Sequence, residues 1–188
     1  IIDMSDFENE GKFLEGTGSL VFDRVNKIAY AVLSERTNSE VLYAWSLKSG
    51  YEVVKFQAFH SVDGMRLPVY HTNVIMSICT DLAVICLDSI DDLEERNAVL
   101  TSLKRFRNVV LISEEQVNQF AGNMLEVRDL NGEKLLIMSE RAYKSLLPDQ
   151  LTVLGEHMDL VYSSLETIEN LGGGSARRMI AEVFLTSK

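Results

Sequence analysis

Four polar positions in this sequence could together perform chemistry on a planar, cationic group. Glu15 and His71 supply a carboxylate and an imidazole, Asn123 supplies an amide, and Ser175 follows a run of three glycines. A carboxylate accepts two N–H bonds from a guanidinium, and a neighbouring histidine can move protons at the guanidinium carbon. Each position also has a structural explanation: Glu15 as a solvated turn residue, His71 as a core histidine, and the glycines as a tight turn.

The spacing of these positions favours a shared site. The segments that hold them open at Gly18, His71, Asn123 and Ser175, which are 53, 52 and 52 residues apart. A fixed interval of this kind is typical of repeat and propeller architectures. If the repeats pack radially, the beginnings of equivalent strands meet near one axis, and the four positions converge there.

Chemistry at a guanidinium carbon also needs a nucleophile, because this resonance-stabilised carbon reacts poorly with water. A thiolate activated by nearby positive charge is the usual nucleophile. The two cysteines, Cys79 and Cys86, lie in apolar, strand-like runs, and we expect both to be buried free thiols. Cys79 follows His71 by about 26 Å of fully extended chain, so it is poorly placed to act with that histidine.

The elements that must position these residues are expected to repeat as strand, strand, helix, strand in one domain over residues 1–188. Repeats are predicted near 18–70, 71–122 and 123–174, with the start of a fourth at 175–188. Predicted strands cover 19–22, 27–33, 53–56, 72–79, 83–87, 109–112, 124–127, 135–138 and 160–162, with a hairpin turn at 131–132. Predicted helices cover 38–50, 91–104, a short segment with a capping box at 113–116, 140–146 and 148–157. A plain α/β sandwich with evenly spaced elements is the alternative.

Composition and charge restrict the class of protein. The 188 residues are 46% hydrophobic with a net charge of −10, which is typical of a globular domain and argues against a nucleic-acid partner, since such binding needs a basic surface. No apolar stretch approaches the ~20 residues of a membrane helix, and no signal peptide is evident. Three histidines without Cys-x-x-Cys spacing argue against a metal site. We expect a cytoplasmic protein with no nucleic-acid or membrane partner and no cofactor.

Four sequence blocks give the chain a resemblance to a known superfamily. They are Phe-Leu-Glu-Gly-Thr-Gly-Ser at 13–19, Tyr-His-Thr-Asn-Val at 70–74, Phe-Ala-Gly-Asn-Met-Leu at 120–125 and Gly-Gly-Gly-Ser-Ala-Arg at 172–177. In this order they resemble signature blocks of the amidinotransferase and arginine-deiminase superfamily of guanidino-group-modifying proteins, and within it the bacterial citrulline or arginine hydrolase-type members. The resemblance implies the superfamily's α/β fold, a five-bladed α/β propeller (pentein), of which this chain would hold the C-terminal part, about three blades.

The resemblance also implies a role for each polar position. Glu15 would contact the guanidinium, and His71 would be the general acid and base. The implied substrate-binding residues are Arg36, Asn123, Gly173, Gly174 and Ser175. The implied reaction is attack by cysteine on a guanidino or ureido carbon, followed by hydrolysis or by transfer of the amidino group to an amine.

Two departures from the family pattern limit this implication. The family's cysteine directly follows the Gly-Gly-Gly-Ser-x-Arg block, and here that catalytic position is Arg178, which stays protonated and cannot attack carbon. About two N-terminal blades would also be lacking, so a second copy of the chain, as a homo-oligomer, or an N-terminal fragment would complete the ring. We therefore predict a family protein for a small guanidino or ureido compound, incomplete or inactive as an enzyme. The alternative is a non-catalytic homologue that binds an anionic ligand or a protein partner.

Overall fold

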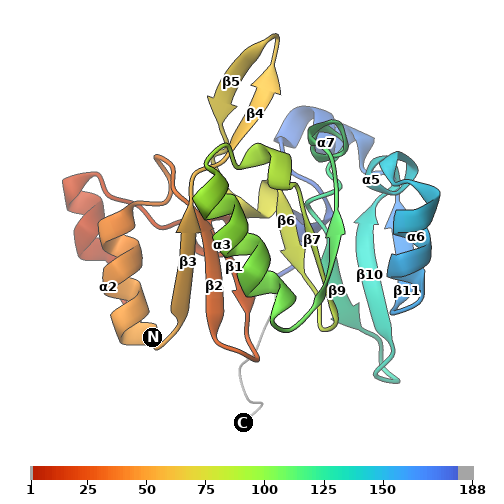
Figure 1. The fold of residues 1–188 in the computed structure, drawn as a ribbon, viewed down its shortest axis with the longest axis horizontal. Helices are drawn as coiled ribbons and strands as arrows, with labels where there is room; N and C mark the ends of the chain where they lie inside the picture. The colour runs from red at the N-terminus through yellow and green to blue at the C-terminus, as the bar shows by residue number, and fades with distance from the viewer. Residues whose placement is uncertain (1, 182–188) are drawn as a thin grey trace.

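The computed structural model describes residues 2–181 and contains three similar three-stranded sheets (Figure 1). The first sheet is built from β1 (Leu20–Asp23), β2 (Ile28–Val32) and β3 (Glu52–Phe56). The second is built from β6 (Met76–Ile78), β7 (Leu82–Ile85) and β8 (Asn108–Leu111). The third is built from β9 (Leu125–Arg128), β10 (Lys134–Ser139) and β11 (Asp159–Ser163). In each sheet the first strand is antiparallel to the second and the third is parallel to it.

A helical crossover joins the second and third strands of every sheet, as parallel neighbours require. The crossovers are α2 (Ser39–Ser49), α3 (Leu93–Lys104), and α5 (Glu140–Ser145) followed by α6 (Pro148–Gly155). The side chain of Asn38 caps the start of α2, and Gly50 ends it in a left-handed conformation. Ser113 and Gln116 form a capping box at the start of α4 (Glu114–Asn118). These caps and the strand, strand, helix, strand repeat are as the sequence predicts.

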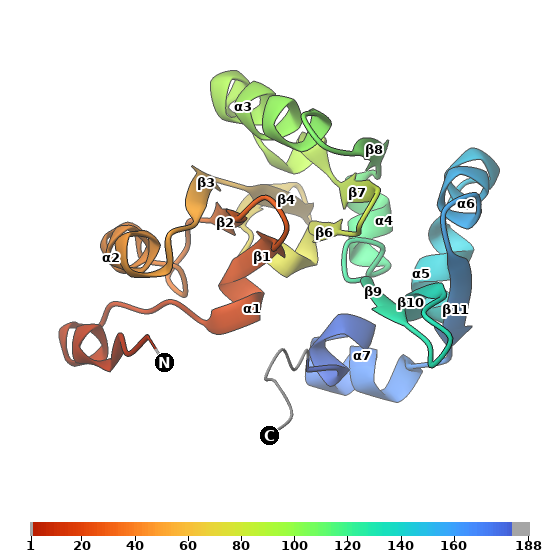
Figure 2. The same ribbon diagram turned by 90° about the horizontal axis from the view of Figure 1, so that it is seen from below.

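The three sheets form an arc in which the first strands lie on the inside (Figure 2). Strand β1 contacts β6, and β6 contacts β9. The third strands and the crossover helices lie towards the outside of the arc, while α1 (Gly16–Ser19) and α7 (Glu166–Gly172) lie at its two inner ends. The fold is therefore mixed α/β and built from small sheets.

Most of the apolar core joins the second and third sheets to β2. Its fully buried members include Tyr30, Ile85, Leu103 and Leu136. A smaller cluster fills the space between the first sheet and α2, around Leu42. None of the described helices is long and apolar enough to cross a membrane.

The structure differs from the sequence-based expectation at the openings of the repeats. The strand expected over 19–22 is present as β1, one residue later, and follows the helical turn Gly16–Ser19 (α1). The strand expected from residue 72 begins only at Met76, because a helical turn occupies Thr72–Val74 (η2). The expected fourth unit opens at 175 with another turn, η4 (Ala176–Met179), and its remainder from 182 lies outside the described residues. These turns are stabilised by hydrogen bonds between distant segments, such as the bond from the Thr72 hydroxyl to the carbonyl of Ser19.

Besides the short 3-10 helices η1 (Ser5–Glu10) and η3 (Leu87–Ser89), two elements were not expected from the sequence. One is a hairpin of β4 (Phe59–Val62) and β5 (Met65–Pro68), which projects from the body (Figure 1). Its turn places Asp63 and Gly64 at positive φ. The other is α7, which leads into the glycine run. Every residue of strand β5 is exposed. The hairpin therefore lacks the alternation of apolar and polar residues from which a strand is predicted.

Candidate functional site

The backbone around Glu15 is fixed by a turn that carries Arg36. Leu14 forms a β-bridge with Thr37. The hydroxyl of Ser19 donates to the carbonyl of Arg36 (2.9 Å) and accepts from the amide of Glu15 (3.1 Å) and from the hydroxyl of Thr37 (2.7 Å). Ser19 and Thr37 are both buried. These bonds place Glu15 and Arg36 side by side at the start of the first sheet.

A second set of bonds brings His71 to the same place. Thr72 directly follows it, and the Thr72 hydroxyl donates to the carbonyl of Ser19 (2.5 Å) and accepts from the amide of Val32 (2.7 Å). The imidazole then lies flat against Gly18, where a Cβ would come within 2.8–3.0 Å of three ring atoms. Gly18 is therefore needed to make room for the imidazole.

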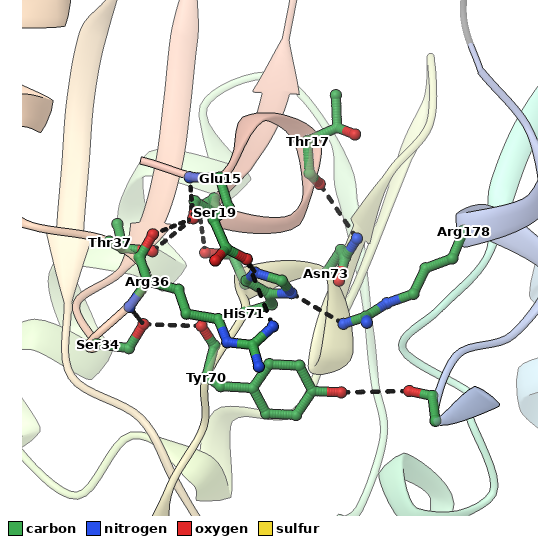
Figure 3. A network of polar contacts seen from close by, with 12 residues as sticks. Glu15, Thr17, Ser19, Ser34, Arg36, Thr37, Tyr70, His71, Asn73 and Arg178 are labelled. Carbon is green, nitrogen blue, oxygen red and sulfur yellow. Dashed lines mark hydrogen bonds and ion pairs between the residues drawn. The ribbon is translucent and has the colours of Figure 1, made fainter. Parts of the chain in front are cut away.

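The side chains of Glu15, His71 and Arg178 meet at the centre of the site (Figure 3). Nε2 of His71 lies 2.7 Å from Oε2 of Glu15, and Nη2 of Arg178 lies 3.0 Å from Nδ1 of His71. Arg36 approaches the same Glu15 oxygen with Nη1 at 3.4 Å. The polar chain therefore runs from Arg36 through Glu15 and His71 to Arg178.

This geometry sets the protonation of His71. A guanidinium can only donate hydrogen bonds, so Nδ1 of His71 must accept from Arg178 and carry no proton. The proton is then on Nε2, which donates to Glu15. Burial lowers the pKa of His71, the hydrogen bond with Glu15 opposes that change, and the charge of Arg178 adds to it. His71 is accordingly neutral near pH 7.

The aromatic ring of Tyr70 lies against the guanidinium groups of both Arg36 and Arg178. The guanidinium carbons of Arg36 and Arg178 each lie 5.2 Å from the centre of its ring, within the range of cation–π attraction. Its hydroxyl donates to the carbonyl of Gly173 at 3.3 Å (Figure 3). Tyr70 was not among the expected site residues, although its place as an aromatic residue directly before His71 was a signal for it.

The glycine run shapes the path of Arg178. Gly173 ends α7 in a left-handed conformation, and a Cβ on Gly174 would lie 2.6 Å from Cδ of Arg178. The buried hydroxyl of Ser175 donates to Oε1 of Glu169 at 2.6 Å. Gly173, Gly174 and Ser175 therefore hold the loop that carries Arg178.

A pocket of about 370 Å³ opens onto this arrangement. The described residues that line it are Glu15, Thr17, Gly18, His71, Asn73 and 177–181. It thus gathers the three residues expected at the catalytic positions. Two residues expected to bind the substrate are not among its lining residues. Arg36 reaches the site only through its contact with Glu15. Asn123 is buried, and its Nδ2 donates to the carbonyl of Asn73 (2.8 Å).

Neither cysteine reaches this pocket. Cys79 and Cys86 are buried free thiols in the core, as the sequence predicts. Burial raises the pKa of the Cys79 thiol to about 12 and also raises that of Cys86, so neither forms a thiolate near pH 7. Among the described residues, no cluster of three His, Cys, Asp or Glu side chains could hold a metal ion.

Several solved structures have a similar fold. The N-terminal domain of ArgZ, an arginine dihydrolase from the ornithine-ammonia cycle in cyanobacteria, was solved as a mutant bound to substrate. It matches with a TM-score of 0.66 and 19% identity over 87% of this chain and 54% of that one. A mutant of AgrE with L-arginine matches with a TM-score of 0.67 and 16% identity over 87% of this chain and 22% of that one. A mutant of DDAH from Pseudomonas aeruginosa with citrulline matches with a TM-score of 0.53 and 17% identity over 84% of this chain and 51% of that one.

The chain therefore spans about half the length of the ArgZ domain and of the bacterial DDAH. At these identities the likeness concerns the fold. No curated protein matches the sequence significantly. The family model of N,N-dimethylarginine dimethylhydrolase, eukaryotic, matches residues 1–185, almost the whole chain. The expected superfamily of guanidino-group-modifying proteins is thereby confirmed, and this chain belongs to the N,N-dimethylarginine dimethylhydrolase family.

Proposed function

We propose that this chain binds a small guanidino or ureido compound at Glu15 and His71 without hydrolysing it, because Arg178 stands where a nucleophile is needed. One observation carries the proposal: the guanidinium of Arg178 donates to Nδ1 of His71 at 3.0 Å. The group that faces the imidazole is a permanent cation with no lone pair to offer.

Glu15 and His71 are suited to binding the substrate, although no nucleophile accompanies them. The carboxylate of Glu15 lines the pocket and can accept N–H bonds from a guanidinium or a ureido group. Neutral His71 can take a proton at Nδ1 once Arg178 moves away. Hydrolysis through a covalent intermediate would require a thiolate to bond to the guanidino carbon. The bond from that carbon to the leaving amine would break, and the amine would take a proton from a protonated His71. The chain supplies the imidazole for this proton transfer but no thiolate.

Arg178 also affects which ligand can enter. Its positive charge repels a guanidinium, whereas a ureido group is neutral and offers a carbonyl oxygen as an acceptor. We therefore expect L-citrulline to bind more tightly than L-arginine, although the ArgZ and AgrE structures hold substrate and L-arginine respectively. The Pseudomonas DDAH structure holds citrulline.

A second candidate is an anionic ligand. Arg36 and Arg178 both approach the ring of Tyr70, and the side chain of Arg36 is half exposed. A carboxylate or phosphate between them would accept from two guanidinium groups. In this case Glu15 would repel the ligand.

Calorimetric titration separates the two candidates. L-citrulline, L-arginine and inorganic phosphate are titrated into the unmodified chain and into Glu15→Gln. For a guanidino or ureido ligand, Glu15→Gln should weaken L-arginine binding at least about tenfold, since a charged hydrogen bond is lost. Tighter phosphate binding by Glu15→Gln, with no binding of either amino acid to the unmodified chain, would instead support the anion site and contradict the proposal.

We also propose that the three sheets are three of five propeller blades, and that a second copy or another polypeptide segment covers the open end of the arc. The third sheet supports association, because the apolar side chains of Val161 and Tyr162 on its strand β11 are 42% and 46% exposed. Exposed apolar side chains on a sheet favour association with another surface. Sedimentation of the purified chain should show association, and a monomer at high concentration would count against this proposal.

A further inference from the structure

Strand β3 forms the open edge of the first sheet, where part of its backbone has no bonding partner. It pairs with β2 alone, and the N–H of Glu52 donates to the carbonyl of Lys27 at 2.9 Å. The backbone groups of successive residues in a strand point alternately to its two sides. Because those of Glu52 face β2, the N–H and C=O groups of Val53 and Lys55 face away from it. None of the residues that the structure describes bonds to these four groups.

The equivalent edge of the second sheet is covered. Leu111 occupies on β8 the place that Lys55 has on β3, because the two strands pair with their neighbours in the same register. The carbonyl of Leu111 accepts from Nε2 of Gln150 at 2.6 Å. On β3 the first outward group with a described partner is the N–H of Gln57, which donates to Glu95 of α3 at 2.7 Å. The edge of β3 before that point is therefore free to add a strand.

A pocket lies on each side of this edge. Figure 2 shows β3 between α2 and α3, and the pockets measure about 330 Å³ towards α2 and about 570 Å³ towards α3. Glu52, Val53 and Lys55 line both pockets. A strand residue directs its side chain to one face only, so these residues reach the other pocket through their backbone. The free edge of β3 therefore lies between two hollows.

The walls of the two pockets indicate which side chains would fill them. Half-buried Val53 packs with the apolar cluster around Leu42, and half-buried Val54 packs with the main core, so each face of β3 offers an apolar surface. The ammonium group of Lys55 donates to the hydroxyl of Ser39 at 3.1 Å. No carboxylate in the described part of the chain pairs with it. An acidic side chain beside Lys55 would be complementary in charge.

We propose that the edge of β3 binds an extended peptide segment as a fourth strand of the first sheet. Its backbone bonds to the outward N–H and C=O groups of Val53 and Lys55, two consecutive apolar side chains enter the two pockets, and an acidic side chain pairs with Lys55. In such strand addition the main chain provides affinity and the pockets provide specificity. The edge does not suit β3 of a second copy, because that strand has its own α2 and α3 beside it. The site is independent of the proposed function, since none of its residues lines the pocket at His71.

The test uses the peptide Thr-Val-Ile-Glu-Val-Thr, acetylated and amidated at its ends, and follows amide hydrogen exchange by NMR. At saturating peptide, exchange of the Val53 and Lys55 amides should slow at least about tenfold. The amide of Val109, which has the place of Val53 on β8, should exchange as before. Glutamine in place of the glutamate of the peptide should weaken binding to the unmodified chain about two- to fivefold and leave binding to Lys55→Gln unchanged.

A proline variant tests the edge itself. Val53→Pro removes one outward N–H without removing a bond to β2, and proline is tolerated where the N–H of an edge strand faces outwards. It should weaken peptide binding at least about fivefold, whereas Val109→Pro, the matched control on β8, should leave binding unaltered. If Val53→Pro fails to fold, hydrogen exchange in the unmodified chain decides alone.

Three results would overturn the proposal. The first is that saturating peptide does not slow exchange at Val53 and Lys55. The second is that Val53→Pro binds the peptide as tightly as the unmodified chain, because the peptide would then lie elsewhere. The third is that Val53→Pro dissociates an oligomer that the peptide does not compete with, because the edge would then hold a second copy.

Discussion

Replacing Gly18 by alanine should displace the imidazole of His71. The added Cβ would lie 2.8 Å from Cε1, 2.9 Å from Nδ1 and 3.0 Å from Nε2, so the ring or the backbone must move. His71 is only 6% exposed and is bonded on both sides, by Glu15 and by Arg178. Overpacking of this kind costs about 1–3 kcal/mol of unfolding free energy. Loss of one of the two hydrogen bonds adds about 0.5–1.5 kcal/mol.

Two measurements check this prediction: urea unfolding, and titration of His71 followed by NMR. Gly18→Ala should lower the unfolding free energy and change the pKa of His71. Gly16→Ala is the matched control. Gly16 has a φ of 49° but no atom within 4 Å of an added Cβ, so this change costs about 1 kcal/mol through the backbone alone and should leave His71 unaltered. The reasoning is refuted if Gly18→Ala leaves the titration of His71 as it is in the unmodified chain.

Three further predictions concern charged groups. Asp23→Asn should lower the unfolding free energy by about 3–5 kcal/mol in urea titrations, because it leaves buried Arg107 without its carboxylate partner; a loss below about 1 kcal/mol would contradict this. Since burial and Arg178 lower the pKa of folded His71 below 6.5, stability should be full above pH 6.5 and fall as the pH drops through the lowered value. His71→Gln should flatten that pH dependence, and an unchanged slope would show that another group titrates. Arg178→Ala should raise the pKa of His71 in NMR titrations and tighten L-arginine binding at least about tenfold, whereas weaker binding would show that Arg178 assists the ligand.

The repeat and the helix ends could be predicted from the sequence because their signals are local. Asn38 and Gly50 bound α2, and Ser113 with Gln116 caps α4, through bonds within a few residues. The turns at the repeat openings could not be predicted in this way. They depend on bonds between distant segments, such as that from Thr72 to the carbonyl of Ser19.

The site was predicted in part. The equal spacing of the segments that carry Glu15, His71, Asn123 and Arg178 predicted that all four would meet. Glu15, His71 and Arg178 line one pocket, but Asn123 does not. The position of a residue within the repeat does not determine where its side chain points. It could therefore not show that the Asn123 side chain donates to the carbonyl of Asn73. It also could not show that Arg178 reaches past Gly174 to His71, because that path depends on the left-handed turn at Gly173.

The central proposal is that Glu15 and His71 recognise the ligand while no nucleophile stands beside them. The most direct test incubates the unmodified chain with L-arginine, L-citrulline and N,N-dimethylarginine, and then records its intact mass and any released ammonia, ornithine or dimethylamine. We predict an unchanged protein mass and no product, because in the proposed function Arg178, which donates to Nδ1 of His71, takes the place of the thiolate. A covalent adduct, or steady release of product, would contradict the account and would require another nucleophile.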